Sequence, residues 1–260
     1  MPTVADLADF LESYAPSALA EEWDNVGLLV GDRGRPVERA MTCLTITPDS
    51  AAEAIAERAN VIVTHHPLPF RPLKRLTADT TPGRLLLDLI AAGISIYSPH
   101  TAFDSALGGI NRRLAEGLGL SGILPLDTTL DELGAGRFGQ LPKTITLREL
   151  AQQTKAFLKI GQLQSVGQLD QPIARVAVAC GSAGQFLEQA RRLGCQALLT
   201  GETNFHTCLE AESTGVGLLL CGHYASERFG VEALADVLAQ QFTGMTVWAS
   251  RREHDPLQWV

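Results

Sequence analysis

The sequence predicts an α/β fold made of two similar lobes, and three observations support this prediction. Short apolar runs typical of strands alternate with helical patterns along nearly the whole chain. Two segments in the second part of the chain repeat the residue pattern of two segments in the first part. Five of the six histidines fall directly after a predicted strand or in the turn that follows it.

The first lobe begins with a predicted amphipathic helix, because apolar residues recur on one helical face at Val4, Leu7, Leu11 and Tyr14. A helix is also expected to begin at Thr47-Pro48, with the threonine as N-cap and the proline at the first helical position. The other elements expected here are strands over 40–46, 61–64 and 94–97 and a helix from Thr81-Pro82 to Gly93.

The second lobe follows the same plan. Two capping-box patterns, Thr146-x-x-Glu149 and Ser182-x-x-Gln185, predict the starts of two helices. Further expected elements are strands over 175–180, 197–200 and 216–221 and a long helix from about 226 to 241.

The repeat relates residues 52–67 to 187–203, and residues 91–118 to 213–238. We interpret it as two related α/β lobes, with chance similarity between generic α/β units as the alternative. The stretch over 125–143 is rich in Gly, Pro and Asp and is a plausible boundary. We therefore predict a first lobe of residues 1–124 plus 222–260, a second lobe of residues 125–221, and a metal site in the cleft between them.

The composition restricts the class of protein. An apolar fraction of 45% and a charged fraction of 19% are typical of a globular chain. The net charge of −8 argues against direct nucleic-acid binding, which needs clustered Lys and Arg. No membrane-spanning run and no secretory signal pattern are present, so we expect a cytoplasmic protein. The 5 cysteines are odd in number and lack CxxC spacing, which disfavours a disulfide framework or a thiolate zinc site.

Three pairs of residues have the character of metal ligands. His65-His66 follows one predicted strand, and His100-x-x-x-Asp104 and His223-x-x-x-Glu227 follow two others. Ligands bind at the carboxyl ends of strands in open α/β sheets, and residues four apart share a helical face. Each pair alone also fits a surface or hydrogen-bonded role, but their equivalent places in a repeat favour metal. Imidazoles with carboxylates favour Zn, Mn, Fe or a similar divalent ion.

Other polar segments are open to more than one interpretation. Glu202 and His206 occupy the second lobe's equivalent of the His65-His66 turn. They are candidates for a general base and a proton shuttle, or for residues that orient the metal ligands. The third interpretation is a polar loop without a role.

The turn over 180–184 is either a phosphate cradle or an ordinary strand-to-helix turn. In the segment over 22–27, the carboxylates could line a pocket, and Trp23 is expected to be a packing residue. Arg71, Lys74 and Arg75 are expected in a solvated loop, with a local anion contact as the alternative.

Five segments together resemble the GTP cyclohydrolase 1 type 2 family, also called the Nif-three-like dinuclear metal-centre family. They occur in family order over nearly the whole chain: EEWDNVGLLVGD (21–32), VTHHP (63–67), PHTAFDSALGGIN (99–111), TGETNFH (200–206) and GHYASERFG (222–230). The length resembles that of the short bacterial form. The sequence departs from the family at Thr45, where an aspartate is common, and in the tail over 254–260.

The resemblance implies two like domains in a toroidal homohexamer, with two divalent ions per chain bound by His65, His66, Asp104, His223 and Glu227. Glu227 would bridge the ions, and His100 would lie nearby. It also implies a metal-dependent hydrolase that opens the guanine imidazole ring of GTP, a small nucleotide substrate, with proton transfer by Glu202 or His206. The alternative is a non-catalytic, metal-binding or regulatory hexamer that acts through protein partners.

Overall fold

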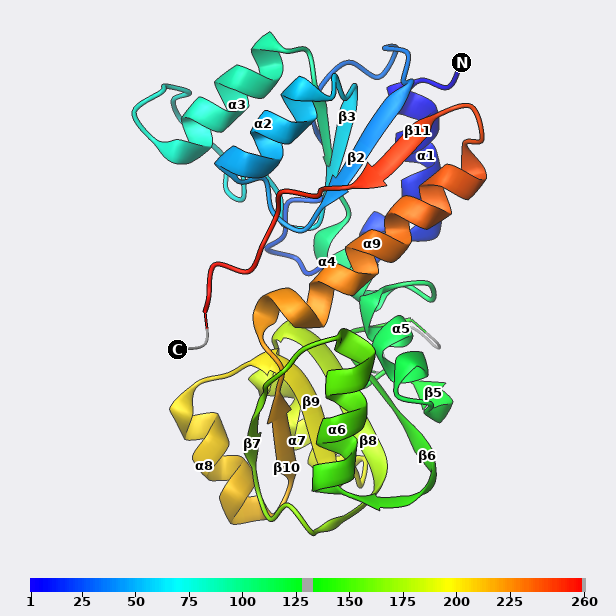
Figure 1. The fold of residues 1–260 in the computed structure, drawn as a ribbon, viewed down its shortest axis with the longest axis vertical. Helices are drawn as coiled ribbons and strands as arrows, with labels where there is room; N and C mark the ends of the chain where they lie inside the picture. The colour runs from blue at the N-terminus through cyan, green and yellow to red at the C-terminus, as the bar shows by residue number, and fades with distance from the viewer. Residues whose placement is uncertain (128–132, 259–260) are drawn as a thin grey trace. The chain divides into compact units, whose positions relative to one another are not determined.

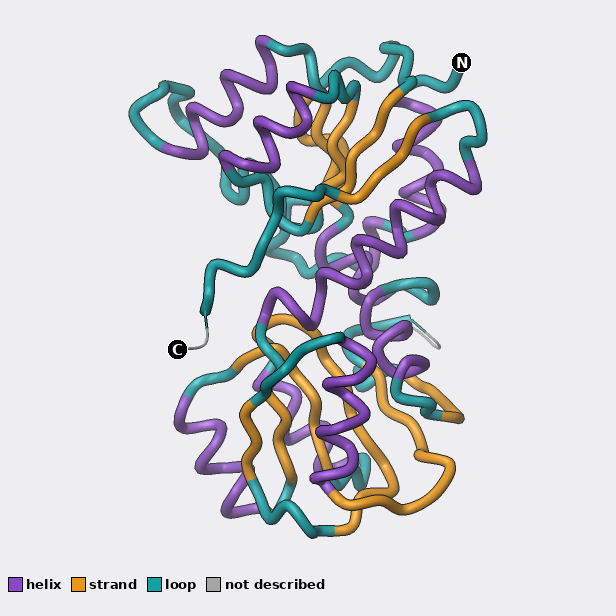
Figure 2. The backbone as a smooth tube through the Cα atoms, in the orientation of Figure 1, coloured by secondary structure: helices purple, strands orange, loops and turns teal. Residues whose placement is uncertain are grey.

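The structure is a computed structural model that describes residues 1–127 and 133–258, and its chain forms two compact units (Figure 1). Unit 1 consists of Met1–Phe103 and Gly230–Val260, and unit 2 consists of Asp104–Phe229. Two helices, α4 (His100–Ser105) and α9 (His223–Gln241), begin in one unit and end in the other. Each unit has its own sheet with helices on both sides (Figure 2), which confirms the predicted α/β class.

Unit 1 contains a five-stranded sheet in the order β1-β4-β3-β2-β11. The strands β11, β2, β3 and β4 are parallel, and β1 is antiparallel to β4. The strands are β1 (Gly27–Val30), β2 (Arg39–Cys43), β3 (Val61–Thr64), β4 (Ser95–Ser98) and β11 (Thr246–Ala249). The other elements are α1 (Val4–Tyr14), a short 3-10 helix η1 (Ser17–Leu19), α2 (Pro48–Ala56) and α3 (Thr81–Ala91).

Helices cover both faces of this sheet, with α2 and α3 on one side and α1 and α9 on the other (Figure 1). Successive side chains of β2 point to opposite faces of the sheet, so this strand contacts helices on both sides. Met41 and Cys43 belong to a buried cluster with residues of α2 and α3. Thr42, between them, donates from its hydroxyl to the carbonyl of Val231 on α9 at 3.0 Å.

The start of α2 follows from local chemistry, as the sequence predicts. The Thr47 hydroxyl accepts from the Ser50 N–H, and Pro48 occupies the first helical position. Because α2 brings the chain back across the sheet, β3 pairs in parallel with β2, and Cys43 lies opposite Thr64. The carboxyl ends of β2, β3 and β4 therefore lie at one edge of the sheet.

Unit 2 contains a six-stranded sheet in the order β5-β6-β8-β9-β10-β7. Its three central strands β8, β9 and β10 are parallel, and the flanking strands are antiparallel to their neighbours. The strands are β5 (Ser121–Leu124), β6 (Arg137–Thr146), β7 (Gln164–Val166), β8 (Pro172–Ser182), β9 (Ala197–Glu202) and β10 (Gly217–Leu220). The helices are α5 (Ile110–Gly117), α6 (Leu147–Leu158), the 3-10 helix η2 (Gly184–Phe186), α7 (Leu187–Arg192) and α8 (Phe205–Thr214).

Two buried clusters lie on opposite faces of the unit 2 sheet. Val178 and Leu199 pack with residues of α5 and α6, whereas Ala177 and Leu198 pack with residues of α7 and α8. Each unit thus has parallel strands joined by crossover helices, which confirms two similar α/β lobes. None of the described helices combines the length and apolar character that a bilayer crossing requires.

Local expectations differ from the structure at two places. The Thr146 capping box is present at the start of α6, but the one predicted at Ser182 is wrong. Ser182 is the last residue of β8, and α7 begins only at Leu187 without a side-chain cap. The stretch over 125–143, expected as a boundary, contains the first part of β6, and its residues 128–132 lie outside the described residues.

Candidate metal centre

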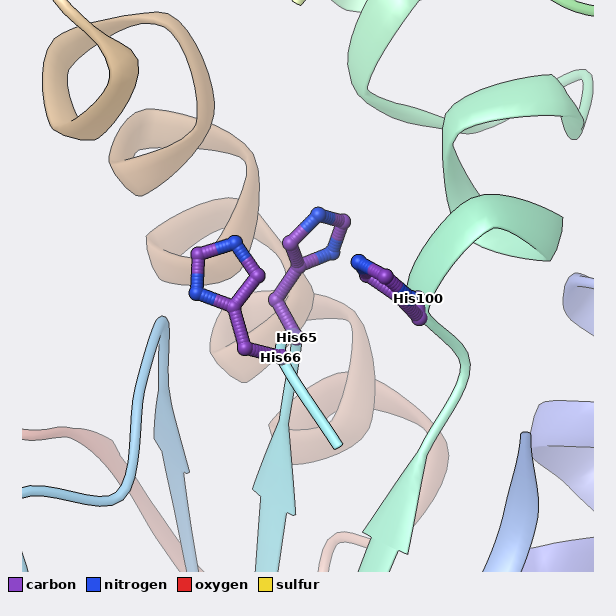
Figure 3. Close-up of side chains that lie close together, drawn as sticks. All are labelled: His65, His66 and His100. Carbon is purple, nitrogen blue, oxygen red and sulfur yellow. The ribbon is translucent and has the colours of Figure 1, made fainter. Parts of the chain in front are cut away.

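Three histidines of unit 1 form a compact cluster at the carboxyl edge of its sheet (Figure 3). His65 and His66 directly follow β3, and His100 follows β4 and begins α4. One nitrogen from each of the three rings lies within 4.8 Å of the other two. His65 and His100 are buried, with exposed fractions of 2% and 8%. The strand ends therefore bring together three imidazole nitrogen donors of the type that binds Zn, Fe or Mn.

Asp24 fixes the orientation of His100. Its buried carboxylate contacts His100 Nδ1 at 2.7 Å and accepts from the Thr101 N–H at 3.1 Å and from the Thr101 hydroxyl. Burial raises the pKa of Asp24, but the hydrogen bonds from His100 and Thr101 outweigh burial and lower the pKa to about 2. His100 has a backbone φ of 27°, an uncommon value for a non-glycine residue, and its Nδ1 is bonded to the ionised carboxylate. Nε2 is then the ring nitrogen left for a ligand.

Thr45 contacts His66 through the ring nitrogen Nδ1, as Asp24 contacts His100. Its hydroxyl contacts His66 Nδ1 at 2.7 Å. The Glu253 carboxylate in turn accepts from the backbone N–H groups of Leu44 and Thr45 at 2.8 and 2.6 Å. Thr45 therefore contacts the predicted ligand His66 through its hydroxyl.

The second group of candidate ligands lies in unit 2, where β9 and β10 end. His223 contacts the Glu202 carboxylate through Nδ1 at 2.9 Å and the Glu227 carboxylate through Nε2 at 3.2 Å. The hydrogen bond to Glu227, followed by that to Glu202, raises the pKa of His223 to about 9 against the effect of burial. A cation that binds Nε2 must displace this proton.

The carboxyl end of β8 packs against the unit 2 carboxylates. The Cys180 thiol donates to Asp104 Oδ1 at 3.1 Å, and burial followed by the charge of Asp104 raises the pKa of that thiol. Gly181 has a φ of +65°, and a Cβ at this position would overlap Glu227 Oε1. The absence of a side chain at Gly181 therefore leaves room for the Glu227 carboxylate. The turn over 180–184 thus lies against predicted ligands, a role that the sequence patterns did not indicate.

The donor sets of both units fit divalent metal ions. His66, His100 and His223 each have Nδ1 in contact with an oxygen of the protein. Metal-binding histidines in proteins are usually held in this way, because the contact fixes the tautomer and the ring orientation. The tautomers are inferred from these contacts.

The sequence predictions for this region have several outcomes. The structure brings His65 and His66 together and adds His100 to them, while in unit 2 it joins Glu202 to His223 and Glu227. His206 is exposed on the first turn of α8, with its ring 6.2 Å from that of Phe205. The roles of Glu202 and His206 in catalysis stay predictions.

The prediction that Trp23 is a packing residue is wrong, because Trp23 is 61% exposed and does not pack in a core. The contact of Asp24 with His100 was not predicted, although the carboxylates of 22–27 were expected to line a pocket and 21–32 was one of the family-like segments. Thr45 was noted as a departure from the family pattern, and its contact with His66 was not predicted. No disulfide joins cysteines among the described residues. Arg71, Lys74 and Arg75 are exposed in a loop.

The comparison with known families identifies the chain. The model of the family described as Duf34/NIF3 (NGG1p interacting factor 3) matches residues 2–256. The chain belongs to the Duf34/NIF3 family. This membership confirms the resemblance found in the sequence segments and covers both units.

Named relatives in this family carry the cyclohydrolase name. The GTP cyclohydrolase 1 type 2 homolog of Clostridium acetobutylicum is 37% identical over 86% of this chain and 85% of its own. The GTP cyclohydrolase 1 type 2 of Helicobacter pylori is 33% identical over 92% of both chains. The crystal structure of a hypothetical protein from Staphylococcus aureus has a TM-score of 0.91, with 28% identity and full coverage of both chains.

Removal of the Asp24 carboxylate is expected to weaken metal binding by the unit 1 histidines. Asp24→Ala leaves His100 Nδ1 without its acceptor, and such losses typically lower metal affinity by about 10- to 100-fold. Competition with a chromophoric chelator would measure the Zn²⁺ affinity, and the circular dichroism melting curve would report folding. Asp79→Ala, in an exposed loop of the same unit, is the matched control. An unchanged affinity in a folded Asp24→Ala protein would contradict the orienting role.

Proposed function

We propose that this protein is a metal-dependent hydrolase that binds two divalent ions, Zn, Mn or Fe, per chain. The observation that carries the proposal is the cluster of His65, His66 and His100, with two of its rings oriented through Nδ1. The residues that would hold the ions are those that the family resemblance implies: His65, His66, Asp104, His223 and Glu227. His100 lies in the same cluster as His65 and His66 and would act as a further donor or as a neighbour that shapes the site.

The chemistry that such ions supply in hydrolases is Lewis-acid activation of water and of a substrate oxygen. The chain's own residues have distinct roles in the proposal. Asp24, Thr45 and Glu202 orient the rings of His100, His66 and His223 through contacts to Nδ1. His206, exposed on α8, is the candidate for proton transfer through an imidazole nitrogen.

The relatives named GTP cyclohydrolase 1 type 2 support GTP as the substrate to test first. The reaction would be hydrolytic opening of the guanine imidazole ring, in which water adds and a ring C–N bond breaks. A fold shared with relatives does not by itself fix a substrate. Assembly as a homohexamer, implied by the family resemblance, is part of the same proposal.

Metal content and turnover measured on the same samples test this function. We expect about two ions per wild-type chain by plasma mass spectrometry, and the loss of at least one ion in His65→Ala and in Glu227→Ala. His254→Ala, which changes an exposed histidine near the C-terminus, is expected to keep both ions. GTP consumption, followed by chromatography, should track the metal content, and light scattering should give six chain masses.

Three outcomes would count against parts of the proposal. If the wild-type protein binds no ion after reconstitution with Zn, Mn or Fe, the histidines are structural. If GTP turnover persists in the Glu227→Ala protein, the metal-hydrolase mechanism is wrong. If metal binds but neither GTP nor other phosphoesters or peptides react, the protein is the non-catalytic, regulatory assembly.

A further inference from the structure

Two exposed aromatic side chains lie beside the histidine cluster of unit 1. Trp23 is 61% exposed and Phe70 is 47% exposed. Their ring centroids are 5.9 Å apart, and they lie 6.0 and 6.2 Å from the ring of His100. A large exposed apolar surface at a polar site is a feature of ligand-binding surfaces. We call Trp23 and Phe70 together the aromatic pair.

Hydrogen bonds hold the two segments that carry the aromatic pair. The Asn25 side chain, two residues after Trp23, donates to the carbonyl of Pro69, the residue before Phe70, at 2.8 Å. Asp24, which follows Trp23, is buried and bonded to His100 and Thr101. The aromatic pair is therefore positioned before any ligand binds, so that less side-chain entropy is lost on binding.

The charge around the pair is uneven. Arg71, Lys74 and Arg75 follow Phe70 in the same loop and are all exposed, although the chain as a whole has a net charge of −8. Glu21 and Glu22 precede Trp23 along the chain and are also exposed. An anionic group of a ligand is thus favoured on the Phe70 side.

We propose that the aromatic pair stacks on the planar base of a nucleotide and that the cationic loop after Phe70 contacts its phosphates. Aromatic side chains stack on every base, and an exposed tryptophan next to an aromatic ring is typical of such platforms. The base then lies beside His100, and the aromatic pair becomes the part of the site that selects a flat ring. This inference rests on the proposed function, because it assigns the base-binding residues of that same site.

The affinity of two probes separates stacking from charge. Isothermal titration gives Kd for GTP and for inorganic triphosphate, which has no base, on the full chain. We expect Trp23→Ala and Phe70→Ala each to raise Kd for GTP by about tenfold, in the range measured for loss of one stacking partner. Their Kd for triphosphate should stay unchanged, and Trp23→Phe should restore most of the GTP affinity.

A second variant and a matched control complete the design. Arg71→Ser is expected to raise Kd for both GTP and triphosphate, by about two- to fivefold, because a phosphate contact carries no base selectivity. Ile90→Ala removes a side chain on α3 of the same unit that is 47% exposed and should leave both Kd values unchanged. Melting curves and light scattering on every variant report folding and assembly.

The results distinguish failure of this inference from failure of the proposed function. Equal GTP affinities in wild type, Trp23→Ala and Phe70→Ala, or no GTP binding by the wild type, would overturn the stacking role. A lower assembly mass in Trp23→Ala with an unchanged Kd would also overturn it, because the pair would then contact a second copy. Trp23-dependent GTP binding in a protein without metal would support stacking and contradict the metal-hydrolase function instead.

Discussion

Replacement of Arg137 by methionine is expected to lower the free energy of unfolding of unit 2 by about 3–5 kcal/mol. The Arg137 side chain is 1% exposed. Its guanidinium donates to the carbonyls of Ser105, Ala106 and Gly136 at 2.7, 3.1 and 2.6 Å, and also to the carbonyl of Gly134. A methionine fills similar space but removes the guanidinium donors from these four carbonyls, and among the described residues only those of Ser105 and Ala106 keep a backbone N–H donor, from Gly134 and Gly109.

Arg137 also bears on the candidate site, because Ser105 directly follows the proposed ligand Asp104. Burial, with a smaller effect of Arg112, lowers the pKa of Arg137 to about 10, so the side chain remains charged at neutral pH. Urea unfolding followed by circular dichroism would measure the change. Arg192→Met, at an exposed arginine of α7, is the control and should change the free energy by less than about 0.5 kcal/mol. A change below about 1 kcal/mol for Arg137→Met would contradict the expectation.

Replacement of Glu53 by glutamine is expected to lower the free energy of unfolding of unit 1 by about 2–4 kcal/mol at pH 7. Glu53 lies on α2 and is 3% exposed. Its carboxylate accepts from Trp248 Nε1 at 3.1 Å, from the Ser250 hydroxyl at 2.7 Å and from the N–H groups of Arg251 and Arg252 at 2.9 and 3.0 Å. Glutamine has one acceptor oxygen and adds an NH₂ group that faces these donors.

The effect of Glu53 should depend on pH. Burial raises the pKa of Glu53, but the hydrogen bonds from Ser250, Arg251, Arg252 and Trp248 outweigh burial and lower the pKa below its usual value of 4.5. A lowered folded-state pKa means that this stabilisation is complete above about pH 4.5 and is lost as the pH falls through the folded-state pKa.

Urea curves from pH 7 to pH 3 would therefore show the wild-type advantage over Glu53→Gln shrinking at the acid end. Glu38→Gln, at an exposed carboxylate of the same unit, is the control and should show no such change. An advantage that stays constant down to pH 3 would mean that Glu53 does not stabilise the fold as a carboxylate. Glu53 holds Arg251 and Arg252, which precede Glu253. Glu253 accepts from the Thr45 N–H, and Thr45 contacts His66. The Glu53→Gln variant therefore also tests whether the C-terminal segment supports the histidine cluster.

The order of elements, and the position of the proposed ligands at strand ends, were predictable because their signals are local. Thr47-Pro48 and Thr146 bond to the backbone three residues away, so the starts of α2 and α6 are visible in the sequence. The strand ending at Thr64 was predicted with the bounds that the structure has. Because parallel strands end at one edge, histidines after such strands were expected to cluster, and His65 and His66 do so.

The tertiary structure alone decided which residues orient those ligands. Asp24 and His100 are 76 positions apart, Thr45 and His66 are 21 apart, and Thr45 and Glu253 are 208 apart. No local period or cap pattern links such pairs, since each contact depends on the packing of separate segments around the sheet edge. The exposure of Trp23 was decided in the same way, because burial depends on which neighbours the fold provides. The sequence alone thus determined the kind of donor and its place at the strand ends, and packing determined its orientation and its neighbours.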